Sequence, residues 1–147
     1  MPATEVFEGG CLCGAIRYRA SAAPLRVVIC HCPMCRRHSG ATALAFAHFP
    51  ADAFAWIGGK PSRYRSSEYA ERGFCPRRGS TLSMHEEVLS ERVQVAVGSL
   101  DAPERVRPDD HVWTQHQLPW FEIADDRPRF RQSSSAVASK ASALRET

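Results

Sequence analysis

The sequence has no hydrophobic run long enough to span a membrane. Its longest apolar stretch, residues 41–49, is interrupted by Thr42 and His48 and falls far short of the ~20 residues that a membrane helix needs. Residues 1–6 show no basic region followed by an apolar run, so no secretory leader is expected. We therefore expect a cytoplasmic protein that has no membrane among its partners.

A strong excess of charge of one sign is also missing. The chain carries 19 Lys and Arg residues against 16 Asp and Glu residues, which gives a net charge of +3. Domains that bind nucleic acid usually carry a basic stripe. Here the adjacent arginines form two separate pairs, Arg36 with Arg37 and Arg77 with Arg78. Nucleic acid is therefore not an expected partner, and nothing in the sequence indicates the oligomeric state.

Long helices are not expected, because ten prolines are spread along the 147 residues. Alternating or continuous apolar patterns predict short strands instead. The expected strands are residues 15–19, 25–29, 43–49, 54–57, 62–65 and 93–97, with residues 58–61 as a turn. Residues 32–38, followed by Ser39 and Gly40, suit a short helix.

The length allows one compact domain that buries about two-thirds of its unfolded surface. We assign this domain, of mainly β class, to residues 5–131. From residue 132 the composition becomes rich in Ser and Ala, and residues 132–147 are predicted to be a disordered tail.

Three cysteines lie within six residues, at Cys30, Cys32 and Cys35. In an extended segment Cys30 and Cys32 point to the same side, and the turn at Pro33 and Met34 lets Cys35 approach from a second direction. Zinc binds such thiolates at about 2.3 Å and prefers four tetrahedral ligands. Three ligands leave one position open, which is typical of catalytic rather than structural zinc.

The remaining cysteines, Cys11, Cys13 and Cys75, are candidates for a second metal site. Isolated cysteines are often small buried hydrophobes, but clustering argues against that interpretation here. Disulfides within C-x-C pairs would close tiny, strained loops. For this second group the sequence leaves metal binding and other roles open.

Several ordered motifs give the chain a resemblance to a known family. They are Gly-Gly-Cys-Leu-Cys-Gly at 9–14, Cys-His-Cys-Pro-Met-Cys-Arg-Arg at 30–37 with Ser39 and Gly40, Gly-Phe-Cys at 73–75 before Gly79 and Ser80, and three later segments at 98–103, 111–113 and 118–120. Over residues 7–130 the chain resembles the glutathione-dependent formaldehyde-activating enzymes, which include the centromere protein V type. The resemblance implies a single-domain, tent-like fold of twisted antiparallel sheets with two zinc sites.

The same resemblance implies roles for all six cysteines. Cys30, Cys32 and Cys35 match the ligands of the catalytic zinc, and Cys11, Cys13 and Cys75 match three of four structural ligands. Arg78 occupies the fourth structural position, where a guanidinium has no lone pair to give a metal. Water or an imidazole such as that of His85 is one replacement. Alternatively the site is empty and Arg78 pairs with a thiolate or a carboxylate.

The implied reaction adds glutathione to formaldehyde and gives S-hydroxymethylglutathione, which is formally a carbon–sulfur lyase working in reverse. Zinc suits this reaction because it deprotonates a bound thiol. The expected partners are therefore a small thiol and a small aldehyde. Two alternatives stay open, namely a related enzyme that uses another thiol or aldehyde, and a non-catalytic binding module stabilised by zinc.

Other side chains near the motifs are candidates for supporting roles. A zinc ion with three thiolates carries a net negative charge, so cations should surround a further thiolate. Arg36, Arg37 and His38 are candidates for holding a glutathione carboxylate, with a solvated surface role as the alternative. His31 is expected to fix the structure through a hydrogen bond.

Two aromatic motifs near the end of the domain suggest further packing. His111 and Trp113 are two residues apart and are predicted to line a pocket from one strand face, and Trp120 is expected to pack beneath the site. For the tryptophans we favour core packing over contact with substrate.

Overall fold

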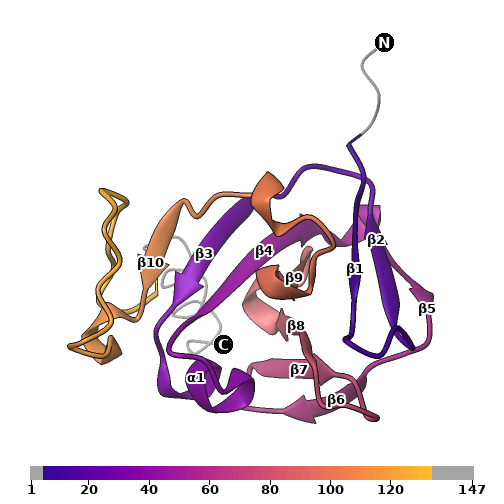
Figure 1. Cartoon of the computed structure of the whole chain (residues 1–147), viewed down its shortest axis with the longest axis horizontal. Helices are drawn as coiled ribbons and strands as arrows, with labels where there is room; N and C mark the ends of the chain where they lie inside the picture. The colour runs from indigo at the N-terminus through magenta and orange to yellow at the C-terminus, as the bar shows by residue number, and fades with distance from the viewer. Residues whose placement is uncertain (1–4, 134–147) are drawn as a thin grey trace.

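The computed structural model describes residues 5–133, which form two β-sheets, one α-helix and five short 3₁₀ helices (Figure 1). The strands are β1 Phe7–Gly10, β2 Arg17–Ala20, β3 Arg26–Cys30, β4 Leu44–Pro50, β5 Phe54–Gly58, β6 Ser62–Arg65, β7 Ala70–Phe74, β8 Thr81–Glu86, β9 Arg92–Ala96 and β10 Asp110–Val112. The helices are α1 Pro33–Ser39, η1 Ala51–Ala53, η2 Glu87–Leu89, η3 Val97–Ser99, η4 Pro103–Arg105 and η5 Thr114–His116.

The smaller sheet has the strand order β1-β2-β5, and the larger has the order β10-β3-β4-β9-β8-β7-β6. All neighbouring strands in both sheets are antiparallel except β10, which runs parallel to β3. The prediction of a mainly β fold built from antiparallel sheets is therefore confirmed. The parallel edge strand β10 is an addition that the sequence does not predict.

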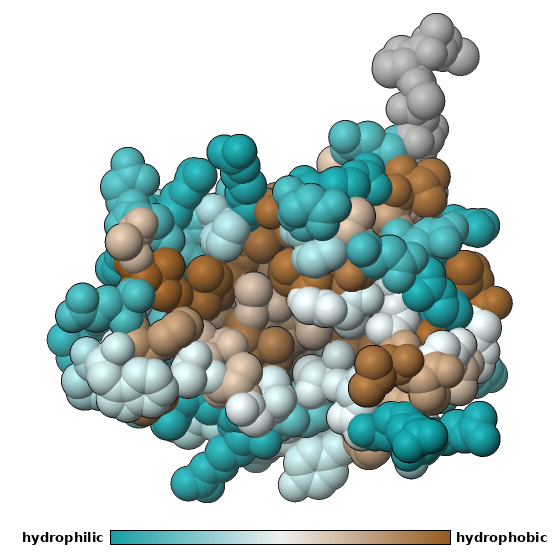
Figure 2. All heavy atoms as spheres, in the orientation of Figure 1, coloured by the Kyte–Doolittle hydropathy of each residue, from teal (hydrophilic) through white to brown (hydrophobic). Residues whose placement is uncertain are grey.

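The two faces of the larger sheet pack against different partners. Phe49, Val93 and Val95 belong to a core that also contains Phe7 and Tyr18 of the smaller sheet. The alternate residues of the same strands belong to a second core on the other face. Strands buried on both faces read as apolar runs. Figure 2 shows apolar side chains in the middle of the view, over β4 and β9, with polar side chains around most of the rim.

Each of the six expected strands overlaps an observed strand, but the turn at 58–61 does not close a hairpin. It separates β5 from β6, and these belong to different sheets because β5 pairs with β2 and β6 pairs with β7. Gly59 adopts a φ of +65°, and a Cβ there would lie 2.4 Å from the carbonyl oxygen of Ala15. Glycine at this position thus lets the chain pass from one sheet to the other.

The predicted helix is confirmed as α1, shifted by one residue. Its N-cap is Cys32, whose Sγ accepts a hydrogen bond from the Cys35 amide at 3.3 Å. The helix stops at Gly40, which adopts a left-handed conformation with a φ of +72° and donates its N–H to the Arg36 carbonyl at 2.7 Å.

The predicted tail is 132–147, and residues 134–147 of it lie outside the described part of the chain. The boundaries of the domain, 5–131, stay a prediction. Within residues 5–133 no helix is long and apolar enough to cross a membrane.

Candidate metal centre

The structure brings Cys30, Cys32 and Cys35 together at the junction of β3 and α1. Their Sγ atoms all lie within 4.8 Å of one another, and all three residues are buried. Two thiolates bound to one zinc ion at about 2.3 Å are separated by about 3.8 Å in tetrahedral geometry. The donor set therefore fits a zinc-sized cation. The role of the three cysteines as metal ligands stays a prediction.

The electrostatics of the three thiols also favour a cation between them. Hydrogen bonds from Cys30 and then from Cys35 lower the pKa of Cys32 to about 2. The contact with the Cys32 sulfur, followed by that with Cys35, raises the pKa of Cys30 far above its ordinary value. Sulfurs this close together therefore oppose one another's ionisation. A divalent cation stabilises all three sulfurs in the ionised form.

One buried cation contacts this group. Arg72 of β7 is 2% exposed, and its Nη1 and Nη2 atoms each lie 3.5 Å from Cys35 Sγ. Its Nε donates to Ser66 Oγ at 3.1 Å, which fixes the plane of the guanidinium. Arg72 is separated from Cys35 by 37 residues, so local motifs do not reveal the contact. The sequence offers one indication of where Arg72 points. In a strand over residues 70–74, alternation places Arg72 on the same face as Ala70.

A cavity of about 380 Å³ opens beside the three thiols, a size typical of small-molecule sites. Most of its walls are apolar, with contributions from Val28, Phe46, Met84, Val112 and Trp113. Within residues 5–133, the arginines that line it are Arg26 and Arg72.

The cations predicted from the sequence do not lie here. Arg36, Arg37 and His38 are absent from the described lining of the cavity, and Arg37 is exposed on α1. All three follow Cys35 in α1, and none of them lines the cavity in the described part of the chain. Arg72, rather than these neighbours in sequence, therefore supplies positive charge to the sulfurs.

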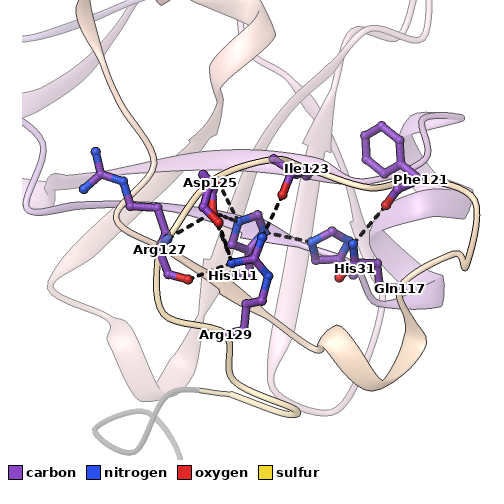
Figure 3. A network of polar contacts seen from close by, with 8 residues as sticks. All are labelled: His31, His111, Gln117, Phe121, Ile123, Asp125, Arg127 and Arg129. Atoms are coloured by element: carbon purple, nitrogen blue, oxygen red, sulfur yellow. Dashed lines mark hydrogen bonds and ion pairs between the residues drawn. The ribbon is translucent and has the colours of Figure 1, made fainter.

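Three side chains form a chain of hydrogen bonds that begins between two of the candidate ligands (Figure 3). His31 Nε2 lies 3.1 Å from His111 Nδ1, and His111 Nε2 lies 2.9 Å from Asp125 Oδ2. Arg129 contacts the same carboxylate, with 3.2 Å between Nη1 and Oδ1. The prediction that His31 makes a structural hydrogen bond is confirmed.

Of the predictions for the later aromatic residues, only the placing of Trp113 beside a pocket is confirmed. His111 is fully buried and contacts His31 and Asp125, whereas Trp113 lines the cavity. The two do not share a strand face because β10 ends at Val112 and Trp113 adopts a left-handed φ of 57°. Trp120 does not pack beneath the site, since it is 71% exposed.

The second group of cysteines also converges. The Sγ atom of Cys13 lies 3.5 Å from that of Cys11 and 3.6 Å from that of Cys75, so this group can hold a metal ion as well. Burial would raise the pKa of Cys11, but the Ile16 amide and the neighbouring thiols prevail and lower it to about 7. Gly14 and Gly79, with φ of +79° and +74°, form the tight turns that follow the cysteines.

No fourth side chain completes this second group within residues 5–133. His85 lies elsewhere, lining a surface hollow with Arg65 and Glu87. Arg78 is exposed and, in the described part of the chain, makes neither a hydrogen bond nor an ion pair. Two of the alternatives left open by the sequence, a His85 ligand and a compensating contact of Arg78, are therefore wrong.

Comparison with known sequences places the chain beside proteins of a known family. The model described as glutathione-dependent formaldehyde-activating enzyme matches residues 6–116. A Halomonas elongata protein, provisionally named as such an enzyme, is 29% identical over 131 residues that cover 80% of this chain and 81% of that protein. A Schizosaccharomyces pombe protein named as an uncharacterized lyase is 34% identical over 76 residues. That match covers 52% of this chain and only 55% of the yeast protein.

Among solved structures, a crystal structure of a Rhodobacter sphaeroides protein shares the fold. The TM-score is 0.53 at 20% sequence identity, and the match covers 83% of this chain and 98% of the other. At this identity the likeness concerns the arrangement of the sheets alone.

Proposed function

We propose that this chain, which belongs to the family of glutathione-dependent formaldehyde-activating enzymes, joins a thiol to a small aldehyde, with glutathione and formaldehyde as the substrates. The new bond links the thiol sulfur to the carbonyl carbon, and the thiol proton ends on the carbonyl oxygen. The reverse reaction breaks the same carbon–sulfur bond, as in a lyase. The observation that carries the proposal is the convergence of three buried thiols at one end of a cavity.

We further propose that Cys30, Cys32 and Cys35 hold a catalytic zinc ion and that Cys11, Cys13 and Cys75 hold a structural one. Bound zinc lowers the pKa of a coordinated thiol, so that the thiol reacts as a thiolate at neutral pH. The fit of both thiol groups to a zinc-sized cation supports this assignment.

The chain's own side chains contribute positioning and charge. Arg72 directs two N–H groups at Cys35 Sγ and places a positive charge where thiolates gather, which favours the ionised form of sulfur. Phe46 and Met84 give the cavity apolar walls, which exclude water from the reacting aldehyde. Arg72 is thus a positioning residue, whereas the three cysteines are the candidate catalytic residues.

The proposal is tested by following the exchange between S-hydroxymethylglutathione and its components by NMR, since the reaction also proceeds without a catalyst. Zinc-loaded protein should accelerate the exchange above the spontaneous rate. Chelated protein and the Cys32→Ser variant serve as controls and should give the spontaneous rate. If zinc-loaded protein matches both controls with several thiols and small aldehydes, the chain is a binding module instead.

A further inference from the structure

The end of the cavity farthest from the thiols carries polar side chains that the proposed reaction does not use. Arg26 of β3 pairs with His48 of β4, and His48 pairs with Gln94 of β9. Side chains directly opposite one another on neighbouring strands lie about 5 Å apart on one face of a sheet. These three residues therefore form a row across the sheet, and together with Glu86 they line the cavity.

Of these polar residues, Arg26 is separated from the thiols by the length of β3. Arg26 and Cys30 stand at opposite ends of the strand, and four residues of extended chain span about 13 Å. A small aldehyde cannot touch both ends of the cavity. An extended ligand of tripeptide size reaches about 10 Å, which suits a molecule with its sulfur at the thiols and its other end near Arg26.

His48 is buried without a partner. It is 3% exposed, and neither ring nitrogen makes a hydrogen bond within the described part of the chain. Burial, with smaller contributions from Arg92 and Arg26, lowers the pKa of His48 to about 3, so the ring is neutral at physiological pH. A neutral imidazole offers one N–H donor and one acceptor. Buried polar groups normally have hydrogen-bond partners, so this exception points to a ligand.

Glu86 is the second side chain that lacks a full set of partners. Its Oε1 accepts a hydrogen bond from Gln94 Nε2 at 3.2 Å, and it makes no ion pair with any residue in 5–133. Burial raises its pKa above the ordinary value. A half-buried carboxylate is stabilised by a cation in contact with it, and a ligand that enters the cavity can supply one.

Arg26 brings the opposite charge to the same place. Its Nε and Nη2 donate to the two carboxylate oxygens of Asp110, at 3.0 and 2.5 Å, and this ion pair fixes the guanidinium at the edge of the cavity. A ligand in the cavity therefore meets the Glu86 carboxylate and the guanidinium of an Arg26 that is already paired with Asp110. A group with both charges on neighbouring atoms is complementary to the pair.

We propose that Arg26, His48 and Glu86 form a subsite for an α-amino acid head group, with the ammonium against Glu86 and the carboxylate against Arg26 and His48. The inference rests on the proposed function for the other end of the ligand, where the thiol reacts. In glutathione the γ-glutamyl group carries such a head at the far end of an extended tripeptide.

Binding is measured by calorimetry with a sulfur-free glutathione analogue in which 2-aminobutyrate replaces cysteine, because this probe does not depend on the thiol chemistry. The N-acetyl derivative of the same analogue lacks the ammonium and is the matched probe. L-Glutamate alone is the third probe. The subsite predicts that the parent protein prefers the analogue to its N-acetyl derivative by about tenfold or more.

The variants are Glu86→Gln and His48→Leu, with His85→Leu as the control because His85 lies outside the cavity. Both cavity variants should weaken binding of the analogue by about tenfold or more, and the control should bind like the parent. His48→Leu should keep or raise the thermal midpoint, since an apolar group replaces an unpartnered buried imidazole. A merely structural role for His48 predicts a lower midpoint instead.

Equal affinity of the parent and both cavity variants for the analogue would overturn the subsite, as would equal affinity of the parent for the analogue and its N-acetyl derivative. L-Glutamate binding as tightly as the analogue would overturn the assignment to a thiol co-substrate.

Thiol–aldehyde exchange is measured separately. Binding that depends on Glu86 without any turnover supports the subsite and overturns the reaction. Turnover with an unchanged KM for glutathione in both variants overturns the subsite alone.

Discussion

The imidazole rings of His31 and His111 are joined by a hydrogen bond of 3.1 Å between Nε2 and Nδ1. Asp125 determines the direction of this bond when both rings are neutral (Figure 3). Its carboxylate only accepts, so His111 Nε2 donates to it, His111 Nδ1 becomes an acceptor and His31 Nε2 donates. The segment between Cys30 and Cys32 is therefore tied to the chain beyond residue 120.

Removing the middle ring should weaken the fold. His111→Leu leaves the buried Nε2 of His31 unpaired, and an unsatisfied buried polar group costs about 1–3 kcal/mol. The free energy of unfolding, measured by urea denaturation, should fall by this amount. His116→Leu is the matched control because His116 is exposed. Equal losses in the two variants would show that the hydrogen-bond chain does not stabilise the fold.

His48 should make the protein sensitive to acid. Its pKa is about 3 in the folded protein against 6.5 in the unfolded chain, so the unfolded state binds the proton more tightly. The contribution of the neutral His48 to the free energy of unfolding is therefore fully present above pH 6.5. It is lost as the pH falls from 6.5 towards 3, by about 3 kcal/mol between pH 7 and pH 4.

The measurement compares urea unfolding of the parent and His48→Leu at several pH values between 7 and 4. The raised pKa of Glu86 acts with the opposite sign, but it is present in both proteins and leaves their difference unaffected. The gap between the two curves should widen in favour of the variant as the pH falls. Parallel curves would contradict the burial of a neutral His48.

Each cysteine of the first group should be needed for one equivalent of metal. Serine at position 30, 32 or 35 removes one of three convergent thiolates, so Cys30→Ser, Cys32→Ser and Cys35→Ser should each lower the zinc content, measured by mass spectrometry of the metal. Cys13→Ser tests the other group and should leave this equivalent in place. If the zinc content is unchanged in all three variants, these cysteines are not the ligands of a zinc ion.

A cysteine at position 78 should tighten the second site. Arg78 is exposed in the turn between Cys75 and Gly79, so Arg78→Cys offers a fourth thiolate to the group of three. Competition with a chelator should show zinc held about tenfold more tightly or better. Arg77→Cys adds the same residue one position away and is the control. If both variants retain zinc like the parent and unfold at the same temperature, position 78 does not face the metal.

The parts of the fold that the sequence predicts are those determined by neighbouring residues. The helix at Pro33–Ser39 follows from a proline, a capping residue and a glycine close together, and the same short span brings three cysteines into contact. Six of the strands are likewise predicted from their apolar patterns, but β8 is missed although Leu82 and Met84 alternate with polar residues. By contrast, β7 carries Glu71 and Arg72, β10 has three residues and β1 ends in two glycines, so none has the usual pattern of a strand.

The contacts made across long stretches of sequence are not predictable in this way. Arg72 reaches Cys35 because the helix lies against the larger sheet, and His48 faces Gln94 only through the register of β4 and β9. The cavity is a product of this packing. The sequence therefore identifies the thiols but not the cation beside them, nor the polar residues at the far end.

The two groups of cysteines differ in the length of the loop that forms when their thiols come together. Cys30, Cys32 and Cys35 close a loop of a few residues, whereas Cys13 and Cys75 are 62 residues apart. Closing a long loop costs more conformational entropy and requires contacts that form late in folding. On the proposed assignment, a nascent chain would capture a first ion soon after residue 35 is made, long before Cys75 has been synthesised. A second ion would bind only after the segments that carry Cys13 and Cys75 have come together.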